Sequence, residues 1–403
     1  MKKFFRNTGI ILAIALPIII FFFYIDSKEK NKQDITLETQ HQVEENESIP
    51  QDHISTTILE AQTNETICTD CESNIEQKEV TPTSNITQTA WIPPWDYNNG
   101  INSLKNFKST FHSVSPVVFQ VNNDGSLTER LDPNLTALKE IRNEKGIKII
   151  PTISNFDHNI IKNILKDEEN TQRHIDQITT VVRTYEYDGI DLDYESISYE
   201  NKQQFLDFVK KLSEVLSKEK KILSITVLPK WGDDVVYTGL VETKKVQDWE
   251  ILGMYADEIR IMAYDYTPSS SEKEGPIAPI DWVEKVLKYA TEKIPNEKIW
   301  LGIHLYSYEW VLPTKDSKEM KVKTNSYTYE VVKSKILSHS YVKTKYNSDF
   351  EEGYAEYKCS ESYFCILYYA TPESIEKRRN LAQKHNIKGI AYWRLGGESG
   401  LIR

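Results

Sequence analysis

Short apolar segments rich in β-branched residues alternate with longer amphipathic segments from about residue 89 to residue 403. The short segments predict strands and the longer ones predict helices. The strand candidates span residues 89–92, 115–120, 147–153, 189–194, 222–228, 258–264, 299–305 and 389–393. The helix candidates span residues 133–143, 174–185, 201–217, 282–293 and 372–385. Regular alternation of this kind is typical of an α/β fold with a parallel sheet.

Eight strand candidates with helical crossovers predict an α/β fold of the (β/α)8 TIM barrel type over residues 89–403. The segment 311–370 breaks the alternation and is rich in Tyr, Lys, Ser and Thr. It predicts a small α+β insertion between strands seven and eight. The number of strands does not establish that the sheet closes, so a doubly wound open sheet is the alternative.

The first 88 residues differ from the rest of the chain. Residues 1–8 contain Lys2, Lys3 and Arg6, and residues 9–25 form an unbroken apolar run. A run of about 17 residues reaches the lower limit for crossing a bilayer, and the basic flank predicts a cytoplasmic N-terminus. We expect an uncleaved transmembrane signal-anchor, with a cleaved secretory signal as the alternative. Residues 26–88 are polar and predict a disordered linker. These features place the barrel at the cell membrane, on its outer side.

The net charge of −11 argues against binding of nucleic acid, because that requires basic side chains to neutralise phosphates. A neutral polymer such as a glycan suits this charge. The chain has four cysteines, in the close pairs Cys68 with Cys71 and Cys359 with Cys365. One C-x-x-C is only half a zinc site, so with the barrel outside the cytoplasm we expect two local disulfides. We expect a monomer.

The candidate fourth strand carries a regular series of acids. Asp191, Asp193 and Glu195 alternate with apolar residues, so all three point to one face of the strand. In a closed barrel the apolar set packs on the helices, and the acids therefore point toward the axis. Like charges in a confined space cannot all ionise, so at least one pKa must rise. A carboxyl with a raised pKa is what a general acid requires at neutral pH.

Two other interpretations of this segment are a solvated acidic edge and a calcium site. A solvated edge does not require regular alternation with Ile and Leu. A calcium site uses ligands from a loop, including carbonyl oxygens, rather than three side chains of one straight strand. Catalysis is favoured, with Glu195 at the carboxyl end of the strand, where the active sites of such barrels lie.

The segment Asp188-Gly-Ile-Asp191-Leu-Asp193-Tyr-Glu195 resembles the signature of glycoside hydrolase family 18, the chitinase-like enzymes. The segments Trp91–Asp96 and Ser115–Gly125 resemble the bacterial branch of the family, which includes spore cortex-lytic enzymes. Further segments resemble the family in the same order across residues 89–403. They are Trp91 in the first strand, Met262-Ala-Tyr264-Asp265 in the sixth, Leu301-Gly-Ile-His-Leu-Tyr306 with Glu309-Trp310 in the seventh, and Gly389-Ile-Ala-Tyr-Trp393 in the eighth.

The resemblance implies a mechanism in which the 2-acetamido group of the substrate attacks the anomeric carbon, and which needs no metal and no cofactor. It implies that Glu195 is the acid and then the base, and that Asp193 binds the acetamido N–H. It also implies that Asp191 shares a proton with Asp193, that Tyr264 donates to the acetamido oxygen, and that Asp265 helps to hold this group. The implied substrate-binding residues are Asp188, Met262, Asp265, Trp393, Trp91, Tyr306 and Trp310.

The resemblance therefore implies hydrolysis of a β-linked glycan that contains N-acetylglucosamine, such as peptidoglycan or a chito-oligosaccharide. The alternative is a lectin-like protein that binds glycan on the same fold without cleaving it. Presence of the acid Glu195 favours the hydrolase.

Overall fold

The computed structural model describes residues 86–107, 111–237, 239–315, 317, 320–398 and 400–402. The predicted anchor, the linker up to residue 85, and Cys68 and Cys71 lie outside these residues. Within the described part of the chain, no helix is long and apolar enough to cross a membrane.

Eight parallel strands form a closed barrel, as the alternation predicted. In order around the barrel they are β1 (Thr87–Ile92), β2 (Ser113–Val121), β5 (Thr152–Asn155), β6 (Gly189–Tyr194), β7 (Ile222–Val227), β8 (Glu258–Ile261), β9 (Ile299–His304) and β15 (Gly389–Trp393). Strand β1 pairs with both β15 and β2, which closes the sheet and excludes the open alternative. Strand β1 begins two residues before the predicted start of the barrel.

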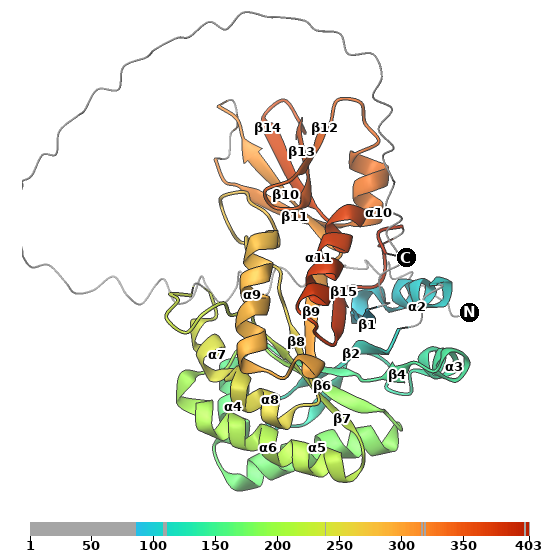
Figure 1. Ribbon diagram of the computed structural model, residues 1–403, viewed down its shortest axis with the longest axis vertical. Coiled ribbons are helices and arrows are strands. Elements are labelled where there is room, and N and C mark those ends of the chain that lie inside the picture. The colour runs from blue at the N-terminus through green and yellow to red at the C-terminus, as the bar shows by residue number, and fades with distance from the viewer. Residues whose placement is uncertain are drawn as a thin grey trace, which may run out of the picture. The chain divides into compact units, whose positions relative to one another are not determined.

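Helices surround the barrel (Figure 1). They are α2 (Tyr97–Asn106), α3 (Thr136–Lys145), α4 (His158–Leu165), α5 (Glu168–Thr184), α6 (Lys202–Lys218), α7 (Val241–Val246), α8 (Trp249–Tyr255), α9 (Ile280–Lys293) and α11 (Pro372–Lys384). On β6, the apolar residues Ile190, Leu192 and Tyr194 are buried in the layer between barrel and helices. The ring of Tyr194 stacks on Phe208 of α6. The predicted division of β6 into an apolar outer face and an acidic inner face is therefore confirmed.

Two predicted strands differ in extent from the observed ones. The candidate at 147–153 is split into β4 (Lys148–Ile149) and β5, because Pro151 has no N–H to donate to a neighbouring strand. The candidate at 258–264 ends at Ile261. Beyond it the chain makes a tight turn in which the N–H of Ala263 donates to the carbonyl of Ile261 (2.8 Å), so Tyr264 does not continue the strand.

The predicted insertion is a five-stranded antiparallel sheet with short helical segments. It contains β10 (Tyr306–Pro313), β11 (Lys323–Thr328), α10 (Tyr329–Val331), the π-helix η4 (Val332–Ile336), β12 (Lys343–Asn347), β13 (Glu352–Lys358) and β14 (Tyr363–Tyr369). Its kind and its place between strands seven and eight are as predicted. It begins at residue 306 rather than 311, because β10 follows β9 after a single residue. The remaining short elements are β3 (Leu127–Glu129), η1 (Pro94–Asp96), η2 (Tyr199–Asn201) and η3 (Asn296–Lys298).

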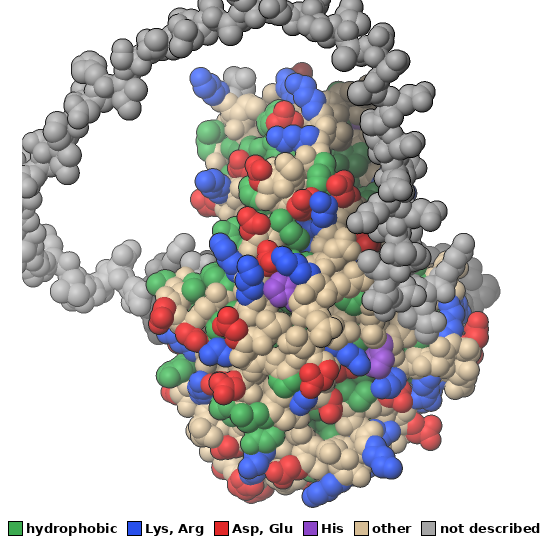
Figure 2. Space-filling model, viewed as in Figure 1, with side chains coloured by type: hydrophobic (Ala, Val, Ile, Leu, Met, Phe, Trp, Pro, Cys, Tyr) green, Lys and Arg blue, Asp and Glu red, His purple; other side chains and the backbone are tan. Residues whose placement is uncertain are grey.

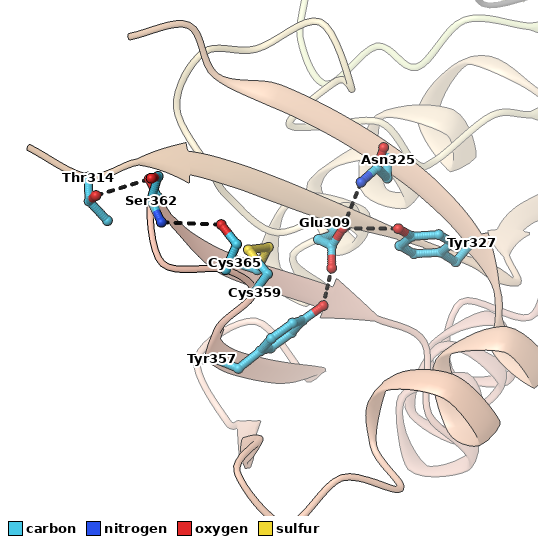
Figure 3. Close-up of a disulfide and its surroundings, with 9 residues drawn as sticks. Glu309, Thr314, Asn325, Tyr327, Tyr357, Cys359, Ser362 and Cys365 are labelled. Carbon is cyan, nitrogen blue, oxygen red and sulfur yellow. Dashed lines mark hydrogen bonds between the residues drawn. A yellow bond between two sulfur atoms is a disulfide. The ribbon is translucent and has the colours of Figure 1, made fainter. Parts of the chain in front are cut away.

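One face of the insertion sheet carries a buried carboxylate with a full set of donors (Figure 3). Glu309 accepts hydrogen bonds from Asn325 (2.7 Å), from Tyr327 (3.0 Å) and from the hydroxyl of Tyr357. The predicted disulfide between Cys359 and Cys365 is formed, with an S–S distance of 2.06 Å, and joins the ends of β13 and β14. The face is thus a small core of its own.

The insertion is joined to the barrel through a second buried carboxylate. Glu352, at the start of β13, accepts from the backbone N–H groups of Ile277 (3.0 Å) and Ala278 (2.6 Å). Arg378 of α11 donates to the same carboxylate at 3.1 Å, and both side chains are buried. Because a buried charge is costly without partners, these contacts fix the insertion beside the carboxyl end of β9.

Candidate active site

The three acids of β6 lie at successive depths inside the barrel. Asp191 is fully buried, whereas Asp193 and Glu195 are partly exposed. Glu195 directly follows the last residue of the strand, and its N–H donates to the carbonyl of Asn155 at the end of β5 (2.9 Å). The acids therefore lead from the barrel interior to its mouth.

Asp191 is held by side chains from the neighbouring strands. It accepts from Trp91 Nε1 (3.0 Å), Thr152 Oγ1 (2.8 Å), Ser224 Oγ (2.8 Å) and Thr226 Oγ1 (3.1 Å). Every one of these contacts requires the carboxylate to act as an acceptor, so the site fits the anion.

Asp193 differs from Asp191 in its hydrogen bonds. Its Oδ1 atom is buried and has no hydrogen-bond partner among the described residues. Burial raises its pKa well above the ordinary value, and the negative charges of Glu195 and Asp191 act in the same direction. The surroundings therefore favour the protonated form of Asp193, and the sharing of a proton with Asp191 stays a prediction.

Glu195 has a pKa raised to about 7. The main cause is burial, and the charge of Asp265 adds to it. A carboxyl that titrates near neutrality can donate a proton in one step and accept one in the next, which is the requirement for a general acid and base.

Tyr264 and Asp265 follow the turn at the end of β8 and close one side of the mouth. Tyr264 is buried, and its pKa is raised well above the ordinary value by burial and by the charges of Asp193 and Glu195, so its hydroxyl remains a donor. Asp265 has a left-handed backbone, with φ of 57°. The residue as a whole is exposed, yet desolvation of its carboxyl raises its pKa against the hydrogen bonds that it accepts from Tyr306 and Tyr308.

Tyr306 and Tyr308, on β10, both donate to Asp265 Oδ1, the second at 2.9 Å. They connect the first strand of the insertion to the barrel mouth. The ring of Tyr306 also meets the ring of Tyr264 edge to face, with centroids 6.2 Å apart. The insertion thus fixes the position of Asp265.

Two tryptophans form the opposite wall. Trp393, at the end of β15, is partly exposed, and Trp91 of β1 is buried beneath it with ring centroids 6.0 Å apart at 64°. Trp91 thus connects the partly exposed ring of Trp393 to Asp191. The carboxyl end of the barrel therefore brings together a candidate proton donor, a second acid, a phenol and an aromatic ring.

A family model described as "Glycosyl hydrolases family 18" matches residues 29–398. This chain belongs to that family. It is a glycosidase.

Curated relatives agree with this membership. The chain is 23% identical over 312 residues to "Uncharacterized glycosylase YvbX" of Bacillus subtilis (strain 168), which covers 74% of this chain and 84% of that protein. It is 24% identical over 324 residues to the "Cortical fragment-lytic enzyme" of the same organism, which covers 78% of this chain and 72% of that protein. The resemblance to the spore cortex-lytic branch is therefore confirmed.

Solved structures share the fold. The spore cortex-lytic enzyme SleL of Bacillus cereus superposes with a TM-score of 0.67 at 23% identity, covering 77% of this chain and 71% of that one. A chitinase from Chromobacterium violaceum ATCC 12472 gives a TM-score of 0.69 at 19% identity, covering 79% and 96%.

Some residues predicted for this family 18 site lie elsewhere. Asp188 is at the amino end of β6, opposite to Glu195, where it accepts from the N–H of Ile149 (2.8 Å). Trp310 is fully buried in the insertion and donates to the carbonyl of Ser271 (3.1 Å). Neither side chain reaches the space around Glu195, and their contacts are structural. Met262 is almost buried at the end of β8.

The sequence interpretation missed the hydroxyl groups around Asp191 and the tyrosine Tyr308. Thr152, Ser224 and Thr226 are polar residues in apolar strands, and Ser224 and Thr226 have the same spacing of two as the acids of β6. That spacing was a usable signal for inward-facing side chains. Tyr308 had no comparable signal, because its role depends on how the insertion folds back on the barrel.

Proposed function

We propose that this glycosidase cleaves a β-linked glycan containing N-acetylglucosamine, either peptidoglycan or a chito-oligosaccharide, by a retaining, substrate-assisted mechanism. The observation that carries the proposal is the unequal state of the two upper acids. The raised pKa of Asp193 disfavours its anionic form, which weakens it as a nucleophile, while the pKa of Glu195 is raised to about 7. The nucleophile is then best supplied by the substrate itself.

In the first step Glu195 gives its proton to the glycosidic oxygen as the bond from the anomeric carbon to that oxygen breaks. The carbonyl oxygen of the 2-acetamido group forms a new bond to the anomeric carbon, which gives an oxazolinium ion. Asp193 and Tyr264 hold the acetamido group in place. In the second step water attacks the same carbon, Glu195 accepts the water's proton, and the acetamido group is restored. Two inversions at one carbon retain its configuration.

The distribution of charged side chains on the surface supports a substrate polymer without strong charge. Acidic and basic side chains are intermixed over the face of the molecule shown in Figure 2, with no single-sign patch among the described residues of that face. Trp393 provides a ring for stacking on the apolar face of a sugar.

We also propose that the barrel works outside the cytoplasm, held to the membrane by residues 9–25. The disulfide between Cys359 and Cys365 supports this, because such bonds persist in oxidising compartments. Labelling of surface thiols and protease accessibility in intact cells would test the location. A barrel protected from added protease would contradict it.

The mechanism is tested with fluorogenic N-acetylglucosamine oligomers whose acetyl group carries one, two or three fluorine atoms. Fluorine withdraws electrons from the carbonyl oxygen and weakens it as a nucleophile. We expect kcat to fall steeply with each fluorine added. Equal rates across the series would contradict participation of the acetamido group, and no cleavage of the parent oligomer or of peptidoglycan would contradict the proposed function.

A further inference from the structure

Arg260 is a fully buried arginine inside the barrel, on β8. Its guanidinium stays charged even in a buried site. Nη2 donates to Glu258 Oε2 at 2.7 Å, and Nη1 lies 3.9 Å from Asp191 Oδ2. Nη1 also donates to the hydroxyl of Ser115. One permanent cation therefore lies between two buried carboxylates, directly below the acids of the barrel mouth.

We propose that Arg260 is a positioning residue for the hydrolysis: its guanidinium stabilises negative charge on Asp191 beneath Asp193, which favours the protonated form of the residue that holds the acetamido group. This inference rests on the proposed function, because the acetamido group belongs to the substrate proposed there. It assigns to Arg260 an effect on the reaction that passes through two other side chains.

The geometry around Asp191 leaves this task to Arg260. The hydrogen bonds that Asp191 accepts come from neutral groups, namely an indole and three hydroxyls. Among the described residues, Arg260 is the only basic side chain within ion-pair distance of Asp191. Because a buried carboxylate is costly, the guanidinium adds a positive charge to the stabilisation that these neutral donors give.

Arg260 also connects this charge to the wall of the site. Its Cζ atom lies 5.7 Å from the ring centre of Trp91. The same ring donates to Asp191 and contacts Trp393 from below. The guanidinium therefore supports both the anion and the tryptophan that lies under the exposed ring.

The other charges near Arg260 do not replace it. Glu258 is an anion on the same strand, and its Oε1 lies 3.7 Å from Nε2 of His112. Burial lowers the pKa of His112, and the charges of Lys148 and Lys388 lower it further, so His112 is neutral at neutral pH despite Glu258. Lys148 and Lys388 line a cavity of about 370 Å³ at the amino end of the barrel rather than the interior.

On the other side, Asp191 faces the acids of its own strand. Asp193 and Glu195 lie above it, with Tyr264 and Asp265 beside them. None of these groups is a cation. Without Arg260 the barrel interior would contain only acids and neutral groups around Asp191, and a negative charge on Asp191 would become more costly. That negative charge is one of the causes that raise the pKa of Asp193.

The test measures kcat/KM against pH for the full chain, with a fluorogenic N-acetylglucosamine oligomer as substrate. In Arg260→Met the acidic limb, where kcat/KM falls as the pH is lowered, should move to a higher pH by about one unit or more. Arg260→Lys keeps the positive charge. Its kcat/KM should fall on the acidic side at the same pH as in the wild type, even if kcat itself is lower. Arg378→Met removes another buried arginine and should reduce stability without moving the limb, so it is the matched control. An unmoved limb in Arg260→Met, or an equal movement in the control, overturns the proposal.

A second variant guards against misfolding of Arg260→Met. Glu258→Gln removes the carboxylate that competes for the guanidinium, so the limb should move to lower pH. Movement to higher pH, or none, would again overturn the proposal.

A measurement without turnover separates this inference from the proposed function. If the wild-type chain cleaves no glycan, the proposed function fails, but the protonation of Asp193 can still be followed by NMR of ¹³C-labelled aspartate carboxyls, with Asp193→Asn for assignment. The titration midpoint of Asp193 should fall in Arg260→Met and stay in Arg378→Met. A midpoint that is unchanged or raised in Arg260→Met contradicts the inference.

Discussion

The buried carboxylates of the insertion and those of the barrel mouth are treated in opposite ways by their surroundings. Glu309 accepts three hydrogen bonds from side chains, and Glu352 accepts two from backbone N–H groups and one from Arg378. In the barrel mouth, Asp193 has an oxygen without any partner among the described residues. Both kinds of acid are costly to bury, but only the first kind is compensated within the protein.

The difference separates structural acids from reactive ones. A carboxylate that accepts three hydrogen bonds has most of its lone pairs engaged, so it is poorly available to a substrate. A carboxyl without donors retains a proton and can form new hydrogen bonds when a ligand arrives. Substrate chemistry is therefore expected at Asp193, with its unpartnered oxygen, and at Glu195, with its raised pKa.

The largest expected effect comes from Glu195→Gln. The amide cannot donate a proton to the leaving oxygen, so kcat should fall by about 1,000-fold or more on a fluorogenic N-acetylglucosamine oligomer. Glu309→Gln is the matched control, an identical change at a compensated acid, and should leave kcat unchanged. Comparable losses in both variants would remove the distinction between the two groups of acids.

The next effect is expected from Asp193→Asn. The variant alters the group that orients the acetamido nucleophile, and kcat should fall by about 100-fold. Steady-state kinetics on N-acetylated oligomers measures this loss. A variant as fast as the wild type would rule out this role of Asp193.

The pH dependence follows from the raised pKa of Glu195, which changes from the ordinary 4.5 to about 7. The acid form is needed for the first step, so kcat/KM should fall by about tenfold per pH unit above that value. The folded state also binds this proton more tightly than the unfolded state does. Its contribution to the free energy of unfolding is complete below pH 4.5 and is lost as the pH rises to about 7.

Denaturant unfolding across that pH range tests the stability part of this prediction. Glu195→Gln should flatten the decline in unfolding free energy relative to the wild type. An identical slope in the two proteins would indicate that Glu195 has an ordinary pKa.

The smallest effect is expected in the insertion. Tyr357→Phe removes one of the donors to Glu309, so the free energy of unfolding should fall by about 1 to 2 kcal/mol with kcat unchanged. Thermal unfolding together with kinetics measures both quantities. A loss of kcat at full stability would place Glu309 in the reaction rather than in the core of the insertion.

Much of the barrel could be predicted from the sequence, because the alternation of side chains within a strand and the alternation of strand and helix segments are both local patterns. Alternation at a spacing of two placed Asp191, Asp193 and Glu195 on one face, and that face is the inner one. Adjacency in a motif was a weaker guide. Asp188 lies in the same motif as Glu195, but seven residues of extended chain carry it about 23 Å away, to the other end of the strand.

Contacts between distant segments could not be predicted in the same way. Trp310 shares a face of β10 with Tyr306, yet four residues of strand place it about 13 Å further from the barrel. The role of Arg260 depends on Asp191 and Glu258, which come from two strands and meet only when the barrel closes. Such contacts arise from register and closure, which no single segment of sequence specifies.

The most direct test of the central claim is digestion of purified peptidoglycan and of chito-oligosaccharides by the full chain and by Glu195→Gln, with mass spectrometry of the released ends. The account predicts new reducing ends at N-acetylglucosamine from at least one of these polymers with the wild type, and none with the variant. Ends at a different sugar, equal release by the variant, or no release from either polymer would contradict it.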